Sequence, residues 1–324
     1  MSYLTNFPNG ISSNGSPVLG GSLPATMGNY YFVDATSGND GDDGKSWDTA
    51  VKTIAQAYSL VVDGNDDVIV LSTYATHTLT EMLDITKSKV HFVGDGFGRL
   101  YGQAAKITLA GAVATDIHMI RNIGSRNTFS GIKFQPGNTA VQTTGGVGEG
   151  GEYTVYSNCS FEAAKLGTTG YCDVLLNGDS THFINCSFGT TAAPVTGNYV
   201  RACVLCTAGG VAGGAASSHD VLFQNCKFFK HAGGTTTTFV TIGASADLSR
   251  GFMEFENCSF IANKTGSVPA VAIACTSSLT SGQVLLTGKT VAYNCTKIAT
   301  ATGVISALPA KAKVQAAMIG IQAT

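Results

Sequence analysis

The segment Tyr156-Ser-Asn-Cys-Ser-Phe161 decides the fold, because it returns along the chain with its internal spacing preserved. The clear copies are Phe183-Ile-Asn-Cys-Ser-Phe188, Phe223-Gln-Asn-Cys-Lys-Phe228 and Phe255-Glu-Asn-Cys-Ser-Phe260. A degraded copy is Tyr293-Asn-Cys-Thr-Lys-Ile298, and an earlier one, Phe129-Ser-Gly-Ile-Lys-Phe134, lacks the Asn-Cys pair. The interval between copies varies, which is typical of a solenoid in which one corner is tight and the other connections are loops.

The spacing inside each copy requires a bend. In a straight strand the aromatic residue two before the asparagine and the one three after it would face opposite sides. An asparagine in the left-handed conformation resets the alternation, so that both aromatics and the cysteine face one interior. Stacked asparagine amides can also bond from coil to coil. The predicted structural ladder comprises Asn158, Asn185, Asn225 and Asn257 with Cys159, Cys186, Cys226 and Cys258.

Composition supports an all-β chain. Of 324 residues, 40 are glycine and only 12% are charged, which favours β structure with many tight turns. The net charge of -2 and the lack of a polybasic run argue against a nucleic-acid partner, and no apolar run reaches the length of a membrane span. We therefore expect a right-handed parallel β-helix with an N-terminal capping helix and an extended N-terminal arm.

The nine cysteines are expected to be reduced. Their number is odd, the start of the chain lacks a signal peptide, and Cys203-x-x-Cys206 has no second pair to complete a zinc site. Stacked thiols in an apolar interior would be inert packing groups. The sequence thus predicts folding in a cytoplasm, with no cofactor and no metal.

Three parts of the chain are expected. Residues 1–28 form an arm with Pro8, Pro17 and Pro24 and Asn-Gly turns at 9–10 and 14–15. Residues 29–305 form the β-helix, with strands at 30–34, 66–72 and 89–96 and swollen glycine-rich loops at 145–153 and 209–220. Residues 306–324 form a C-terminal cap or a contact between subunits.

A capping helix is expected at about residues 46–61. Its apolar stripe has helical spacing, with Ser46 as the N-cap and Trp47 as the anchor of the cap. The stripe comprises Trp47, Val51, Ile54, Tyr58 and Val61.

Residues 30–300 resemble the pectate-lyase-like β-helix superfamily found in phage proteins. The resemblance lies in Tyr31-Phe-Val-Asp34, Gly38-Asn-Asp40, Asp43-Gly44 and Thr53-Ile54, and in the Asn-Cys-Ser-Phe coils, which are similar to its rungs. It implies the fold and leaves function open, because that superfamily includes lyases, hydrolases, tailspikes and inert structural proteins.

The arm resembles the start of head-associated virion proteins of tailed phages, through Ser2–Ile11 and Pro17-Val-Leu-Gly20. The resemblance implies a non-enzymatic capsid decoration (knob) protein on the virion surface. Such a protein would assemble as a homotrimer and bind the major capsid protein or other virion subunits. The expected attachment residues are Tyr3, Leu4, Phe7, Pro8 and Ile11.

An enzymatic alternative rests on two acids and two histidines that precede successive corners, Asp179 and Asp220 with His182 and His219. We expect turn residues rather than catalytic ones, because no second acid, Arg or Lys recurs at matched positions. The alternative function is a tailspike or fibre protein that binds or depolymerises host surface polysaccharide. A third is a passive glycan-binding decoration, with Tyr171 and Tyr199 as stacking candidates.

The loop Gly38–Gly44 is a candidate calcium site, since it concentrates Asp and Asn oxygens. It lacks the bidentate Glu and the spacing of an EF-hand, so Asx turns are the preferred interpretation.

Overall fold

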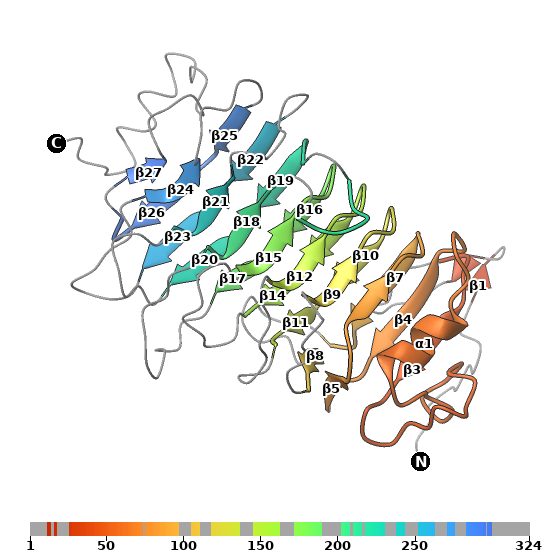
Figure 1. Cartoon of the computed structure of the whole chain (residues 1–324). Helices are drawn as coiled ribbons and strands as arrows, with labels where there is room; N and C mark the ends of the chain where they lie inside the picture. Colours follow the sequence, from red (N-terminus) through yellow and green to blue (C-terminus); the bar gives the residue numbers. More distant parts are fainter. Residues whose placement is uncertain are drawn as a thin grey trace.

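The computed structural model describes most of the chain between residues 26 and 299. The described residues are 12–13, 16–17, 26–73, 75–96, 105–110, 118–136, 145–162, 172–189, 202–207, 210–215, 218–230, 238–243, 252–262, 271–275, 283–295 and 297–299. They wind into one elongated stack of coils (Figure 1).

Three parallel sheets form the walls of the stack. Sheet one contains β3 (Tyr30–Val33), β4 (Asp67–Leu71), β7 (Val90–Gly94), β10 (Thr128–Ser130), β13 (Val155–Ser157), β16 (His182–Ile184), β19 (Val221–Gln224), β22 (Phe252–Glu256) and β25 (Gln283–Thr287). Sheet two contains β5 (Thr76–Leu79), β8 (Ala105–Leu109), β11 (Ile132–Phe134), β14 (Ser160–Phe161), β17 (Ser187–Gly189), β20 (Lys227–Lys230), β23 (Ser259–Ala262) and β26 (Val291–Tyr293). Sheet three contains β6 (Leu83–Ile85), β9 (His118–Asn122), β12 (Gly145–Glu149), β15 (Cys172–Leu176), β18 (Val204–Cys206), β21 (Val240–Ile242), β24 (Val271–Cys275) and β27 (Lys297–Ala299).

The chain visits sheets one, two and three in turn and then returns to sheet one. Each strand pairs in parallel with its equivalents in the coils before and after it, as β13 does with β10 and β16. Such parallel crossovers are right-handed. The structure confirms the predicted right-handed parallel β-helix, and the strands predicted at 30–34, 66–72 and 89–96 correspond to β3, β4 and β7.

Sheet one turns into sheet two at what we call the asparagine corner, a column of residues with positive φ. Asn158, Asn185, Asn225 and Asn257 have φ between 53° and 54°, which confirms the left-handed bend expected from the repeat. The copy without Asn-Cys makes the same corner with Gly131, at φ 69°. The column members are Gly131, Asn158, Asn185, Asn225, Asn257 and Gly288.

The degraded copy was placed wrongly from the sequence. Glu256 aligns with Thr287, so the residue above Asn257 in the asparagine corner is Gly288. Asn294 follows β26 instead and donates through Nδ2 to the carbonyl of Ala262, at 2.8 Å. Asn257 Oδ1 accepts from the backbone N–H of Lys289, at 2.8 Å, so its partner is backbone and not another asparagine. The amide ladder stays a prediction at the other three positions.

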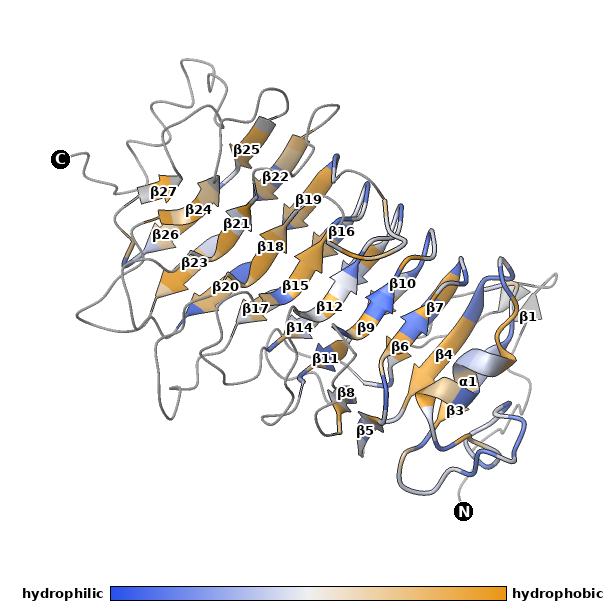
Figure 2. Ribbon diagram, viewed as in Figure 1, coloured by the Kyte–Doolittle hydropathy of each residue, from blue (hydrophilic) through white to orange (hydrophobic). Residues whose placement is uncertain are grey.

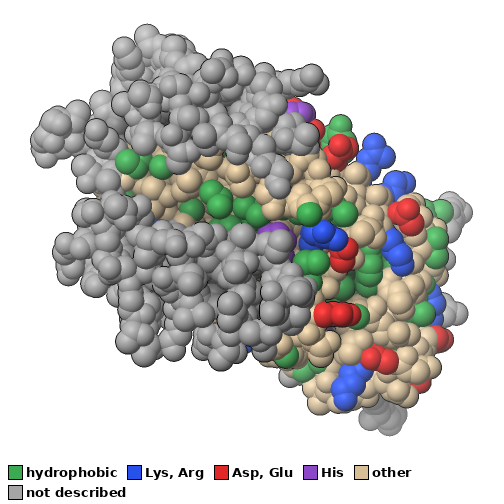
Figure 3. Space-filling view, viewed as in Figure 1, with side chains coloured by type: hydrophobic (Ala, Val, Ile, Leu, Met, Phe, Trp, Pro, Cys, Tyr) green, Lys and Arg blue, Asp and Glu red, His purple; other side chains and the backbone are tan. Residues whose placement is uncertain are grey.

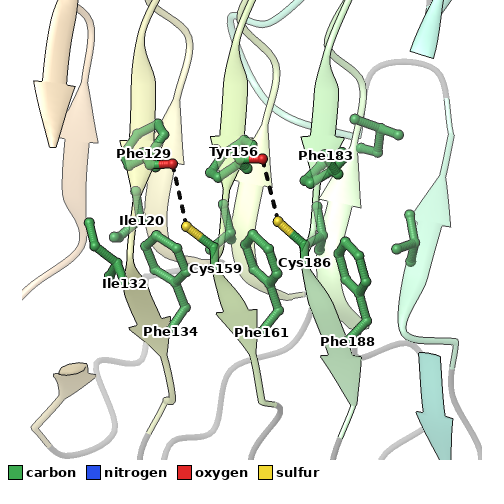
Figure 4. Packing of buried hydrophobic residues seen from close by; sticks show 14 of the residues in the cluster. Ile120, Phe129, Ile132, Phe134, Tyr156, Cys159, Phe161, Phe183, Cys186 and Phe188 are labelled. Atoms are coloured by element: carbon green, nitrogen blue, oxygen red, sulfur yellow. Dashed lines mark hydrogen bonds between the residues drawn. The ribbon is translucent and has the colours of Figure 1, made fainter. Parts of the chain in front are cut away.

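The asparagine corner brings two ladders of stacked aromatic rings into one core. In the first, Tyr156 lies between Phe129 and Phe183 with ring centroids 4.7 and 5.0 Å away, and in the second, Phe161 lies 4.9 Å from Phe188 (Figure 4). These rings are fully buried, and each contributes about 1.5–3 kcal/mol relative to exposure.

The predicted cysteine column lies between the aromatic ladders and is fully buried. Each thiol donates to the carbonyl of an aromatic residue in the preceding coil. Cys159 Sγ lies 3.4 Å from the oxygen of Phe129, and Cys226 Sγ lies 3.2 Å from that of Phe183. The cysteine is therefore a small apolar residue whose weak donor finds an acceptor inside the core.

The capping helix α1 (Ile54–Leu60) is shorter than the sequence predicted. Its N-cap is Thr53, whose side chain accepts from the backbone N–H of Gln56, so Ser46 was the wrong cap. Trp47 is not a core anchor, because it is 42% exposed and contacts Phe32 on the outer face. Val51 instead forms a β-bridge with Val33. The apolar stripe predicted from the sequence therefore includes residues that are not part of the helix, namely Trp47, Val51 and Val61.

The two glycine-rich stretches behave differently. Gly145–Glu149, predicted as a loop, is strand β12, paired with β9 and β15, so that prediction was wrong. A side chain at Gly148 would lie 2.6 Å from the ring of His118, so glycine provides room for the neighbouring coil. Figure 2 shows hydrophilic colours on β9 and pale colours on β12, whereas β4 and β19 are mostly hydrophobic.

The second stretch is a loop, as predicted, where the structure describes it. Val211 is buried on the outer face of sheet three against Cys172 and Leu175. The side-chain amide of Asn177 makes two hydrogen bonds to this loop. Its oxygen accepts from the N–H of Gly210, and its nitrogen donates to the carbonyl of Ala215.

Candidate functional site

The chain also turns through left-handed residues where sheet three passes into sheet one, at what we call the variable corner. Its members align from coil to coil but are of five different residue types, and their φ angles lie between 50° and 60°. They are Asp66, Lys89, Arg126, Tyr153, Ser180 and Asp220. The sequence did not reveal this corner, because a column of five residue types at six positions has no repeating signal.

The residues just before the variable corner place three titratable groups in one row. Glu152 and Asp179 form a parallel β-bridge, and the backbone N–H of Ser180 donates to the carbonyl of His219. Glu152, Asp179 and His219 therefore lie on three consecutive coils, about 4.8 Å apart. Figure 3 shows acidic and basic side chains lying close together over the N-terminal coils in that view.

His219 lies between two carboxylates. Its Nδ1 is 2.5 Å from Asp179 Oδ1 and 3.6 Å from Asp220 Oδ2. Burial raises the pKa of the Asp179 carboxyl; the charge of His219 opposes that rise, and the charges of Asp220 and Glu152 reinforce it. The structure thus brings together three of the four residues proposed from the sequence. His182, in β16, aligns instead with Val155 and Leu222.

This arrangement is better suited to an ion pair than to glycoside cleavage. The two carboxylates approach within about 6 Å of each other, close to the separation used by retaining glycoside hydrolases. Both carboxylates, however, contact the same imidazole nitrogen of His219, which is the contact of an ion pair. The cluster therefore holds two coils together at the variable corner.

A shallow pocket of about 270 Å³ lies along the same corner, toward the N-terminal coils. Its cations are Lys89 and Arg126, and its walls include Glu152 and Tyr153. Lys89 lies 3.6 Å from Asp66, and the Arg126 guanidinium lies 5.7 Å from the Tyr153 ring. Both cations thus contact the adjacent member of the variable corner.

In the candidate calcium loop, side-chain oxygens of Asn39, Asp40 and Asp43 accept hydrogen bonds from backbone N–H groups of the chain. Asn39 Oδ1 accepts from the N–H of Gly41 and Asp43 Oδ1 from that of Lys45, which confirms the Asx turns. Asp40 Oδ1 accepts from the N–H groups of Lys52 and Thr53, at 2.8 Å each. Throughout the part of the chain that the structure describes, no three His, Cys, Asp or Glu side chains form a metal-binding group.

The core contains a carboxylate that the sequence gave no reason to single out. Glu149 is fully buried and accepts from the Tyr156 hydroxyl at 2.5 Å and from Asn122 Nδ2 at 2.9 and 3.1 Å. Burial raises its pKa to about 7, against the opposing effect of these donors. At the equivalent position, the preceding coil has Asn122, the coil before that has Ile85, and the next coil has Leu176. Because the residue type is not repeated, only the tertiary alignment identifies Glu149 as an internal polar site.

The column cysteines have no reactive character. Burial raises the pKa of the Cys159, Cys186 and Cys226 thiols well above their ordinary value. This agrees with the expectation of inert packing groups.

Several predicted residues lie outside the described part of the chain. These are the attachment residues Tyr3, Leu4, Phe7, Pro8 and Ile11, the stacking candidates Tyr171 and Tyr199, and the tail 306–324. Within the arm, β1 (Ser12–Ser13) pairs antiparallel with β2 (Ser16–Pro17), around the predicted turn residues Asn14 and Gly15. Among the described residues, no helix has the length and hydropathy needed to span a membrane.

Comparison with known proteins identifies the fold alone. No protein-family model matches the chain, and no curated protein matches it. Among solved structures, a rhamnogalacturonan lyase matches with a TM-score of 0.57 and 14% identity, covering 82% of this chain and 69% of that one. A pectin methylesterase from Aspergillus niger matches with a TM-score of 0.53 and 12% identity, covering 90% and 93%. The pectate lyase Pel9A matches with a TM-score of 0.50 and 12% identity, covering 82% and 78%.

The shared feature is the parallel β-helix. At such low identities, these matches carry no residue role over to the present chain.

Proposed function

We propose that this chain is a non-enzymatic structural protein of a tailed phage particle, a capsid decoration subunit attached through its N-terminal arm. The observation that carries the proposal is the contrast between the arm and the rod. Residues 1–28 contain no charged residue and no histidine, and three prolines interrupt the first 24. A segment of that composition cannot form its own core, and its start resembles head-associated virion proteins.

The rod supports a structural role through its uninterrupted core. Aromatic stacking runs from Phe92 to Phe255 in one ladder and from Phe134 to Phe260 in the other. A rigid body of this kind on the capsid surface would have the major capsid protein or other virion subunits as partners. Homotrimeric assembly belongs to the same proposal.

Truncation of residues 1–25 tests the attachment role. The truncated chain should keep its thermal transition and be lost from particles, because the anchors Tyr3, Leu4, Phe7, Pro8 and Ile11 are gone. A matched variant with Ser12 and Ser13 changed to alanine keeps the anchors and should be incorporated normally. Incorporation of the folded truncation at the wild-type level would refute the proposal.

A second candidate function is binding or cleavage of host surface polysaccharide, as in a tailspike. Two observations favour it: the matched structures named above are two polysaccharide lyases and a pectin methylesterase, and Asp179 and Asp220 approach each other around His219. Incubation with host capsule or lipopolysaccharide, followed by measurement of released sugar, tests cleavage. Release that is abolished in Asp179→Ala and Asp220→Ala would favour the enzyme. A glycan array would detect a decoration that binds sugar without cleaving it.

A further inference from the structure

Sheets two and three stop one coil earlier than sheet one at the N-terminal end of the rod. Sheet one continues through β4 to β3, whereas sheet two ends at β5 and sheet three at β6. Helix α1 lies at this end and contacts β3, β4 and β5 (Figure 1). Among the described strands, none lies on the outer side of β5, so this strand is the edge of sheet two.

The pairing of β5 with β8 determines which backbone groups face that edge. The N–H of Ala110 donates to the carbonyl of Leu79, and His77 and Leu79 align with Ile107 and Leu109. In a parallel ladder alternate residues bond to the same neighbour. The N–H and C=O groups of Thr76 and Thr78 therefore point away from β8, toward the open side.

Natural edges carry charges, prolines or bulges, or a covering element. Within β5 itself the exposed side chains are Thr76 and Thr78, and the strand contains no Asp, Glu, Lys, Arg or proline. Exposed Thr80 and Glu81 follow it, and Lys52 and Asp84 lie nearby. The backbone that directly follows β6, by contrast, is covered by α1. The Tyr58 hydroxyl accepts from the N–H groups of Thr86 and Lys87, at 2.8 Å each.

A pocket of about 500 Å³ lies along this open edge. Its lining comprises the continuous run from Thr76 to Asp84 and residues at or near α1, among them Thr53, Ile54 and Tyr58. A strand added to β5 would therefore contact this lining. Four or five extended residues, about 16 Å of chain, would match the length of β5.

We propose that the β5 edge binds the N-terminal segment of this chain, residues 3–7, as an added strand. The segment Tyr3-Leu-Thr-Asn-Phe7 is uncharged, as are the exposed side chains of β5, and it ends at Pro8, which cannot donate to a ladder. The described chain resumes at Thr26, whose Oγ1 donates to the carbonyl of Asp66 at the start of the first full coil. The 18 residues from 8 to 25 could span about 60 Å when extended.

The donor and acceptor are different copies of the chain, so that the arm of one subunit attaches it to its neighbour. This step rests on the proposed attachment role of the arm, with another virion subunit of the same kind as the partner. The β5 edge is thus a receptor through which neighbouring subunits hold one another on the particle.

Photo-crosslinking of the full chain tests the proposal. A benzophenone amino acid replaces Thr78, the probe chain is refolded together with a ¹⁵N-labelled chain lacking the probe, and the crosslinked peptides are identified by mass spectrometry. We expect crosslinks to residues 1–11 carrying the ¹⁵N label. The probe at Lys227, on the interior strand β20 of the same sheet, should give none to that segment.

A double variant in the segment makes the test independent of the probe site. Thr5→Pro with Asn6→Pro removes one ladder donor whichever face of the segment meets β5, and crosslinking should fall at least tenfold, whereas Ser2→Pro should leave it unchanged. Crosslinks confined to the same copy, or to other regions of the chain, would overturn the proposal. If only such crosslinks are found and particles still incorporate the protein through its arm, the attachment role is retained and the proposed function of the β5 edge is wrong.

Discussion

In the coils that contain β10, β13, β16 and β19, two corners share the left-handed backbone conformation but use different kinds of residue to adopt it. At the asparagine corner the left-handed residue is Asn or Gly and is followed, in the Asn-Cys copies, by a fully buried cysteine. At the variable corner it is any of five residue types, each with a Cβ that the left-handed region penalises by about 1–2 kcal/mol. The difference shows that backbone geometry alone does not dictate the residue.

Contacts between adjacent coils offset that penalty at the variable corner. Lys89 lies beside Asp66, and Arg126 lies over the ring of Tyr153. The asparagine corner instead relies on a residue that tolerates the conformation, and its neighbours supply stability by packing. The first corner is thus stabilised from the inside and the second from the surface.

Removing one aromatic ring at each corner should give the largest contrast. Phe183→Ala deletes a fully buried ring from the middle of its ladder and should lower the free energy of unfolding by about 3–5 kcal/mol. Tyr153→Ala deletes a ring that is 54% exposed and should cost less than about 1 kcal/mol. Denaturant unfolding of both variants measures the difference, and comparable losses would contradict the contrast between interior and surface.

The buried carboxylate near the variable corner should make stability depend on pH. Because burial raises the folded-state pKa of Glu149 from 4.5 to about 7, its contribution is fully present below pH 4.5 and is lost as pH rises through 7. The loss should approach about 3 kcal/mol. Unfolding measured from pH 4 to 8 checks this, with Glu149→Gln as the variant in which this part of the slope disappears. An unchanged slope in that variant would assign the effect to other groups.

Alanine and glycine scans should separate the two ways of adopting positive φ. Asn185→Ala should cost about 1–2 kcal/mol and Asn185→Gly much less, since only the former adds the left-handed penalty. Ser180→Ala should be close to neutral, because serine already bears that penalty, and Ser180→Gly should gain up to about 1 kcal/mol. Thermal denaturation measures the four variants; equal costs for the two alanine changes would mean that asparagine has no special role.

The smallest effect is expected from the ion pair at the variable corner. A double-mutant cycle of Asp179→Asn and His219→Gln should give a coupling below about 1 kcal/mol, because both groups are partly exposed. The coupling should weaken further at high salt. A coupling of several kcal/mol would identify the cluster as a major fold determinant rather than a surface contact.

Sequence reasoning succeeded where a physical requirement repeated in the same residues. The asparagine corner, the buried cysteines and the Asx turns at Asn39 and Asp43 all follow from residue types with few alternatives. It failed where tertiary contact replaced local preference. Gly145–Glu149 is a strand because neighbouring coils pair with it on both sides, and α1 starts at Ile54 because Val51 is drawn into a bridge with Val33.

The polar cluster was predicted in part. The spacing of Asp179 and Asp220 before their corners placed them on one face, but a register offset of one residue aligns Asp179 with His219 and Ser180 with Asp220. Sequence spacing cannot supply that offset, since the loop between the coils has no fixed length.

The sequence by itself determined the solenoid, because flanking aromatics can share one interior only if each asparagine bends the chain. Only the tertiary structure decided which residues meet across coils: the acid buried at Glu149, the imidazole between two carboxylates and the open edge at β5. Those contacts depend on register between segments 27 or more residues apart, and register is set by the whole stack, not by any local segment.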